Sequence, residues 1–190
     1  IVELLEKEVV PGWSKVRSGA GREGFIHTVN LRERKEDDGY LSEKNTEGKG
    51  YFHAMRQRLA VEEETFRERI KESALEYMGT QYRWGGKSSQ GIDCSGLTFM
   101  SYLNSGLLIY RDASIREEFP VSPVKQEDLK TGDLIFFPGH VALYLGNGKY
   151  IHSTGYVKTP YVTINSLREE DEDYREDLAQ KITGCGSVFI

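Results

Sequence analysis

The sequence has little cysteine, little histidine and no long apolar run. Of its 190 residues two are cysteines, Cys94 and Cys185, and four are histidines. Two cysteines form at most one disulfide, which excludes a disulfide scaffold and leaves a Cys94–Cys185 bridge as one alternative. No apolar run approaches the ~20 residues that span a bilayer, and the first residues do not resemble a secretory signal peptide. We therefore expect no membrane span.

An excess of positive charge is also absent, because 25 Lys and Arg stand against 30 Asp and Glu, a net charge of −5. Nucleic acid and anionic lipid are therefore not expected partners. The composition, 38% hydrophobic and 29% charged, is that of a folded globular protein. The length allows one good core and a smaller module.

The first third of the chain predicts a small β module followed by a linker. Residues 2–6, 13–17 and 24–27 alternate apolar and polar side chains and are separated by Gly and Pro, as in a meander of short strands. Residues 32–50 are polar and charged, which predicts a linker or mobile loop.

A helix is predicted from Glu62 to Met78. Apolar residues recur there every fourth position, three glutamates stand in the first turn, and Gly79 follows as a stop. The four apolar residues are Phe66, Ile70, Ala74 and Met78.

Cys94 stands between an acid and a Ser-Gly pair, just before the apolar run 97–100. This pattern predicts a thiol at a loop-to-helix junction, with the helix running to about Leu103. Free backbone N–H groups and the helix dipole stabilise a thiolate there, and such sites lower a cysteine pKa from about 8.5 to roughly 3.5–7.5. The alternative is a small buried residue.

The second half changes to a period of two. Residues 133–137, 140–145 and 149–153 predict antiparallel strands, with Asn147-Gly148 as a hairpin turn. Residues 107–130 are expected to be irregular, because prolines interrupt them, and Cys185 is expected in a terminal strand. The fold class is therefore α+β, a helical half in front of an antiparallel sheet.

Two histidines, His140 and His152, bracket this hairpin downstream of Cys94. A nucleophilic cysteine needs a base, and the base needs a third polar group to orient it. If Gly146 faces Lys149, the two histidines fall on opposite faces of the hairpin, so a bulge or longer loop is needed to bring them together. The alternatives are two structural histidines or a zinc site with Cys94, although their spacing is longer than that of most zinc pairs.

Four motifs stand in order in the second part of the chain. They are Gly79-Thr80-Gln81-Tyr82-Arg83-Trp84-Gly85-Gly86, Gly91-Ile92-Asp93-Cys94-Ser95-Gly96-Leu97, Gly132-Asp133-Leu134-Ile135-Phe136-Phe137 and His140-Val141-Ala142-Leu143-Tyr144-Leu145-Gly146 with Ile151-His152. Together they resemble the NlpC family of papain-like cysteine peptidases over residues 62–190. A shorter resemblance, over about thirty residues, links residues 13–31 to the second half of a bacterial SH3-like domain. The chain is thus expected to hold a partial SH3-like β domain (1–34), a linker (35–61) and a peptidase domain (62–190).

The resemblance implies a papain-like fold and a catalytic set without a metal or organic cofactor. In it Cys94 is the nucleophile, His140 the base and acid, and His152 the orienting residue. The hydroxyl of Tyr82 and the backbone near Cys94 would stabilise the oxyanion. The expected substrate-binding residues are Asp93, Ser95 and Arg111.

The resemblance also implies a substrate. Family members cleave the bond from γ-D-glutamate to L-lysine or meso-diaminopimelate in peptidoglycan stem peptides, and those with an SH3-like domain require a free N-terminal L-alanine. Asp93 is the expected partner of that ammonium. The alternatives are a lytic D,L-endopeptidase on intact peptidoglycan and a non-catalytic wall-binding module.

Overall fold

The computed structural model describes residues 2–18, 23–31, 33, 49–117 and 119–189, with the backbone alone for 49–61. The chain forms two compact units, Ile1–Ser42 and Glu43–Ile190. The predicted linker, residues 35–61, lies partly outside the described residues, and from Lys49 onward it is helical.

The N-terminal unit contains a three-stranded antiparallel sheet in the order β1-β2-β3. The strands are β1 (Val2–Val10), β2 (Trp13–Ser18) and β3 (Glu23–His27), and the short helix η1 (Thr28–Asn30) follows. The β meander expected from the sequence is confirmed.

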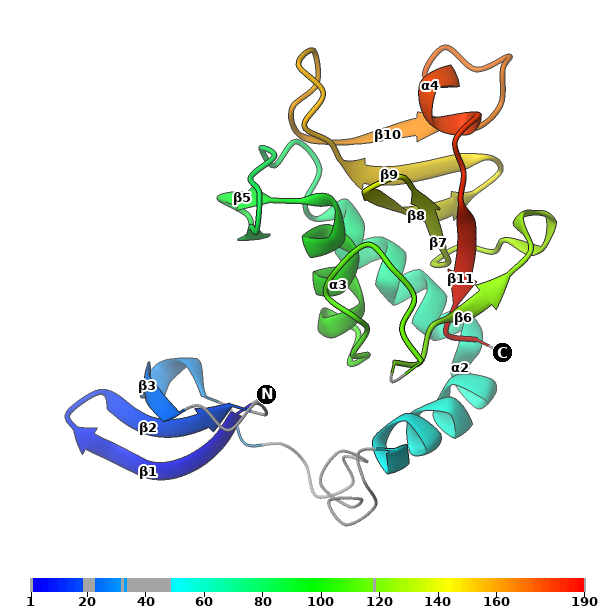
Figure 1. Cartoon of the computed structure of the whole chain (residues 1–190). Coiled ribbons are helices and arrows are strands. Elements are labelled where there is room, and N and C mark those ends of the chain that lie inside the picture. The colour runs from blue at the N-terminus through cyan, green and yellow to red at the C-terminus, as the bar shows by residue number, and fades with distance from the viewer. Residues whose placement is uncertain (1, 19–22, 32, 34–48, 118, 190) are drawn as a thin grey trace. The chain divides into compact units, whose positions relative to one another are not determined.

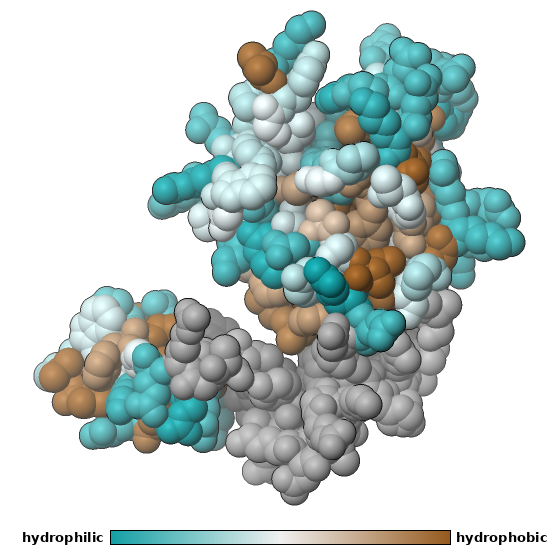
Figure 2. Space-filling model, viewed as in Figure 1, coloured by the Kyte–Doolittle hydropathy of each residue, from teal (hydrophilic) through white to brown (hydrophobic). Residues whose placement is uncertain are grey.

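Polar contacts hold this sheet together more than an apolar core does. The fully buried Ser14 hydroxyl accepts the N–H of Glu8 at 3.1 Å and lies 2.8 Å from the Thr28 hydroxyl. The rings of Trp13 and His27 stack with centroids 3.8 Å apart. Apolar atoms reach the surface of the unit, seen in brown in the space-filling view (Figure 2). The most exposed are Leu4, Val10, Phe25 and Val29.

The second unit begins with the helix α2 (Lys49–Leu75), which is interrupted by non-helical backbone at Glu62. After the break the predicted four-residue period is confirmed, since Phe66, Ile70 and Ala74 are all buried. The helix ends at Leu75, three residues before the predicted end. Met78 lies in the following turns with 46% of its surface exposed.

A six-stranded antiparallel sheet follows in the order β10-β9-β8-β7-β11-β6. The three strands predicted around the hairpin are confirmed as β7 (Leu134–Phe137), β8 (His140–Gly146) and β9 (Lys149–Ser153). Cys185 lies in a terminal strand as predicted, and both cysteines are free. The other elements are β4 (Lys87–Ser88), β5 (Gly91–Ile92), α3 (Cys94–Asn104), β6 (Ser122–Val124), η2 (Gln126–Asp128), β10 (Val162–Ser166), α4 (Glu176–Ala179) and β11 (Gly184–Ser187).

The sheet has an apolar layer on each face, because side chains alternate along each strand. In β7, Leu134 and Phe136 belong to the main core with α2 and α3, whereas Ile135 and Phe137 belong to a second cluster with Leu178 of α4. Figure 1 shows α3 beside the central strands and α4 at the other side of the sheet. The α+β class is confirmed.

A buried ion pair joins α2 to the sheet. Arg67, 4% exposed, lies 2.9 Å from the Asp133 carboxylate and donates to the Thr131 carbonyl at 2.7 Å. Asp133 also accepts the Ser187 hydroxyl of β11 at 2.6 Å. Within the described part of the chain, no helix has the length and apolar character needed to cross a bilayer.

Candidate active site

Cys94 is the first residue of α3, at the loop-to-helix junction that the sequence predicts. The Asp93 carboxylate caps the helix by accepting the Gly96 N–H at 2.6 Å. The backbone N–H groups of Val141, Ser95 and Cys94 itself all stabilise the negative form of the sulfur. The thiol is therefore surrounded by backbone donors from both the helix and β8.

The expected low pKa of Cys94 is nevertheless wrong for the free protein. Burial, which leaves only 8% of the residue exposed, raises the pKa of the thiol above its ordinary value. The charge of Asp93 acts in the same direction, and the three backbone donors only partly offset both effects. The local motif indicates the donors but not the depth of burial.

His140 and His152 are brought together by the bulge that the sequence argument requires. Gly146 pairs with Lys149, but the register then shifts so that Tyr144 faces Tyr150. The shift places the two histidines on one face of the hairpin. His140 Nε2 lies 2.8 Å from His152 Nδ1.

Both histidines are held in the neutral form. Burial, reinforced by the charge of Arg175, lowers the pKa of His140 to about 4. Burial and the neighbouring His140 lower the pKa of the fully buried His152 to about 3. The two ring nitrogens face each other and do not converge on one ion, a geometry that argues against the zinc alternative.

Asn165 on β10 completes a row of hydrogen-bonded side chains that runs from His140 through His152 to Asn165. The sequence motifs do not indicate Asn165. Its Oδ1 lies 3.0 Å from His152 Nε2, and its Nδ2 donates to the Asp173 carbonyl at 2.9 Å. In β10 (Val162–Ser166) Asn165 shares the polar face of the alternation with Thr163, so the strand pattern carries no signal that distinguishes it.

Tyr82 lies on the same side of the site as the thiol. Burial raises the pKa of its phenol, and the charge of Asp93 raises it further. The backbone of Tyr82 pairs with that of Ile92, two residues before Cys94. Its ring packs against Gly155, where a Cβ would come within 3.3 Å of the ring. Glycine at position 155 therefore leaves room for the Tyr82 ring.

Asp93, Ser95 and Arg111 form one hydrogen-bonded cluster. Arg111 donates to the Ser95 hydroxyl at 2.6 Å and lies 3.1 Å from the Asp93 carboxylate. Asp93 also accepts the N–H groups of Gly85 at 2.7 Å and of Gly96. A carboxylate has about four acceptor positions. The Ser95 hydroxyl also donates to Asp93, at 3.4 Å, so these positions are used to hold the loop, the helix, Ser95 and Arg111.

Glycines in these motifs allow close packing of the backbone around Cys94. A Cβ at Gly96 would lie 2.2 Å from the Gly86 carbonyl oxygen, and one at Gly86 would lie 2.4 Å from the Gly91 oxygen. The glycine pattern recognised in the sequence is thus a steric requirement of the junction.

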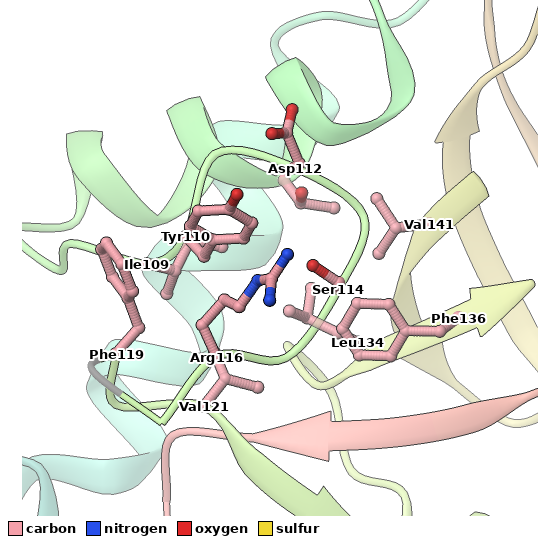
Figure 3. Close-up of a pocket in the computed structure, with 11 residues that line it drawn as sticks. Ile109, Tyr110, Asp112, Ser114, Arg116, Phe119, Val121, Leu134, Phe136 and Val141 are labelled. Carbon is pink, nitrogen blue, oxygen red and sulfur yellow. The ribbon is translucent and has the colours of Figure 1, made fainter. Parts of the chain in front are cut away.

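A small pocket lies between α3, the sheet and residues 109–121. Thr98, one helical turn after Cys94, lines it, as does Val141, whose N–H stabilises the sulfur. Figure 3 shows Arg116 reaching into the middle of this pocket between Tyr110 and Ser114. Arg116 lies over the Tyr110 ring at 5.3 Å. The pocket is also lined by Asp112, which is exposed.

Comparisons with known proteins agree with this architecture. The chain is 52% identical over 128 residues to dipeptidyl-peptidase 6 of Lysinibacillus sphaericus, covering 67% of this chain and 46% of that protein. It is 41% identical over 85 residues to the gamma-D-glutamyl-L-lysine dipeptidyl-peptidase of Bacillus cereus, covering 40% and 25%. The chain thus spans less than half the length of these two relatives.

Among solved structures, the peptidoglycan hydrolase RipB of Mycobacterium tuberculosis superposes with a TM-score of 0.56 at 26% identity. That match covers 75% of this chain and 79% of RipB. The model of the NlpC/P60 family matches residues 79–175, which hold Cys94, both histidines and Asn165. Because this segment is about half of the chain and contains the whole site, the chain belongs to the NlpC/P60 family.

Proposed function

We propose that this chain is a cysteine peptidase that hydrolyses the γ-D-glutamyl-L-diamino-acid bond of bacterial cell-wall stem peptides. The observation that carries the proposal is the buried, hydrogen-bonded pair His140–His152, together with Val141, the residue after His140, which donates its N–H to the Cys94 sulfur at the start of α3. Two of the similar proteins are named as dipeptidyl-peptidases, one of them for γ-D-glutamyl-L-lysine.

The proposed reaction begins with the transfer of the Cys94 proton to His140. The sulfur attacks the γ-carbonyl carbon of D-glutamate, and the oxyanion is stabilised by backbone N–H at the start of α3 and by the Tyr82 hydroxyl. One such donor is worth about 3–4 kcal/mol of barrier. His140 then gives its proton to the leaving amine as the C–N bond breaks. Water, with His140 again as base, hydrolyses the thioester and restores the thiol.

The substrate's free ammonium requires a carboxylate with unoccupied oxygens. Asp93 is the partner expected from the sequence, but its oxygens are used within the cluster described above. We propose instead that the ammonium is bound by Asp112, an exposed acid that directly follows Arg111. Arg111 has five N–H donors and stays our proposed contact for the substrate carboxylate, with Ser95 supporting it.

The N-terminal sheet is proposed to belong to an SH3-like domain over residues 1–34, with the peptidase domain over residues 62–190. Support comes from the three antiparallel strands and from the resemblance of residues 13–31. Family members with an SH3-like domain require a free N-terminal L-alanine, so this proposal predicts the same requirement for this chain.

The test is cleavage of L-Ala-γ-D-Glu-L-Lys and of its N-acetylated form, with products identified by mass spectrometry. We expect L-Ala-D-Glu from the free amine alone, none from Cys94→Ala, and a raised KM in Asp112→Asn with kcat little changed. Cleavage of both peptides would favour the wall-lytic alternative. Binding to peptidoglycan without cleavage of either would favour the non-catalytic module and overturn the proposal.

A further inference from the structure

The side chain of Asn165 lies between a catalytic histidine and a fixed backbone carbonyl. The Asp173 carbonyl accepts the backbone N–H of Ser166 at 3.0 Å and the Asn165 Nδ2 at 2.9 Å. The segment around Asp173 is held by Lys149, whose Nζ lies 2.8 Å from Asp171 and 2.5 Å from the Asp173 carboxylate. The carbonyl is therefore a fixed acceptor.

This acceptor sets which way the Asn165 amide points. Only the NH₂ of an amide donates, and only its oxygen accepts. With Nδ2 on the Asp173 carbonyl, Oδ1 is the atom 3.0 Å from His152 Nε2. His152 Nε2 must therefore be the donor and carry the proton.

The proton position of His152 then decides that of His140. A neutral imidazole has one N–H and one bare nitrogen, so a proton on His152 Nε2 leaves its Nδ1 as an acceptor. The partner of that Nδ1 is His140 Nε2, at 2.8 Å, which must donate. His140 is left with its Nδ1 bare, the form in which this nitrogen can accept a proton.

We propose that Asn165 is a positioning residue that fixes the tautomers of His152 and His140, so that the bare Nδ1 of His140 is the base for Cys94. The inference rests on the proposed function, because a base is needed only if Cys94 is the nucleophile. Donation runs in one direction along the row, from His140 to His152, then to Asn165, then to the Asp173 carbonyl.

Removal of the Asn165 acceptor allows the direction of hydrogen-bond donation along the row to reverse. His152, which is fully buried, then has no partner for a proton on Nε2 in this row and gains by moving it to Nδ1, where His140 can accept it. His140 would then carry its own proton on Nδ1, and a protonated Nδ1 cannot take the proton of a thiol.

Two readouts test this on the full chain. The first is the ¹⁵N imidazole spectrum at pH 7, with signals assigned by His140→Gln and His152→Gln. We expect both histidines to be protonated on Nε2 in the wild type and this pattern to be lost in Asn165→Leu. The second is kcat, which we expect to fall at least about 100-fold in Asn165→Leu, the lower end of what general-base catalysis contributes. KM should change little.

Two further variants separate positioning from folding. Asn165→Asp keeps an oxygen that accepts from His152 and should retain more kcat than Asn165→Leu. The matched control is Asn104→Leu at the far end of α3, which also removes a hydrogen bond, Asn104 Nδ2 to the Ser73 hydroxyl at 3.0 Å. It should leave kcat and both tautomers unchanged.

A wild-type spectrum with a proton on Nδ1 of either histidine would overturn the inference. So would unchanged tautomers and kcat in folded Asn165→Leu. The spectrum does not depend on turnover, so the two proposals fail separately. Expected tautomers without peptide cleavage would contradict the peptidase assignment alone, and cleavage with the opposite tautomers would contradict the role of Asn165 alone.

Discussion

The Cys94 sulfur is subject to two opposing influences. Three backbone N–H groups favour its negative form, whereas burial and the Asp93 charge favour the thiol, and burial dominates. The same burial keeps His140 neutral. At pH 7 the site therefore holds a neutral thiol and a neutral imidazole, and in the proposed mechanism the ion pair forms only during the reaction.

This protonation state can be measured through the ultraviolet absorbance of the thiolate, taken as the difference between wild type and Cys94→Ser. The pKa of Cys94 is raised above its ordinary value of 9.0, so the thiol stays protonated below pH 9.0. The pKa of His140 is lowered to about 4, so the imidazole is neutral above pH 4. We expect no thiolate signal at pH 7 and its appearance only above pH 9. A signal at pH 7 that disappears in His140→Ala would contradict the neutral pair.

Sequence patterns locate the chemistry-bearing residues better than they locate the protons. Cys94, His140 and His152 follow from residue types and order, and the need for a bulge follows from parity. Asn165 does not, because its role depends on the pairing of β10 with β9, a contact that strand periodicity does not specify. The direction of the Cys94 pKa depends on burial, which a local motif does not report.

At the scale of elements, the site depends on how α2 and α3 are fixed to the sheet. A buried polar link is made by Arg67, which joins α2 to Asp133 before β7 and lies over the Phe189 ring at 4.1 Å. Asp133 is itself only 1% exposed. Loss of Arg67 would leave this charge buried without its cation.

We expect Arg67→Ala to lower the free energy of unfolding by about 3–5 kcal/mol, the usual cost of breaking a buried ion pair. Urea denaturation measures the change. The matched control on the same helix is Lys71→Ala, which removes the more exposed pair of Lys71 with Glu68 and should cost no more than about 1 kcal/mol. Equal effects in the two variants would show that the buried pair does not stabilise the fold.

The elements predicted from periodicity are confirmed where several residues repeat a pattern. The strands around the Asn147-Gly148 turn and the helix after Cys94 are of this kind. Periodicity predicts an end of α2 at Met78, whereas the helix ends at Leu75, because an apolar residue fits the period whether or not the core reaches it. The strand β6 is not predicted, because it has only three residues and contains Pro123.

At the scale of the whole chain, the two units differ in how many apolar side chains they bury. The second has apolar layers on both faces of its sheet, whereas in the first unit only Val16 is a buried apolar residue among those described. The sequence-based division into a small β module and a larger α+β domain stays a prediction. The proposed proton transfers and nucleophilic attack need residues of the second unit alone.

The central claim is that Cys94 forms a covalent acyl-enzyme with the γ-carboxyl group of D-glutamate. The most direct measurement is mass spectrometry of the protein after brief incubation with L-Ala-γ-D-Glu-L-Lys and acid quenching, followed by digestion. We predict an L-Ala-D-Glu acyl group on the peptide that contains Cys94, and neither adduct nor turnover in Cys94→Ala. Cleavage of the peptide by Cys94→Ala at the wild-type rate, with no adduct on Cys94 in the wild type, would contradict the proposed mechanism.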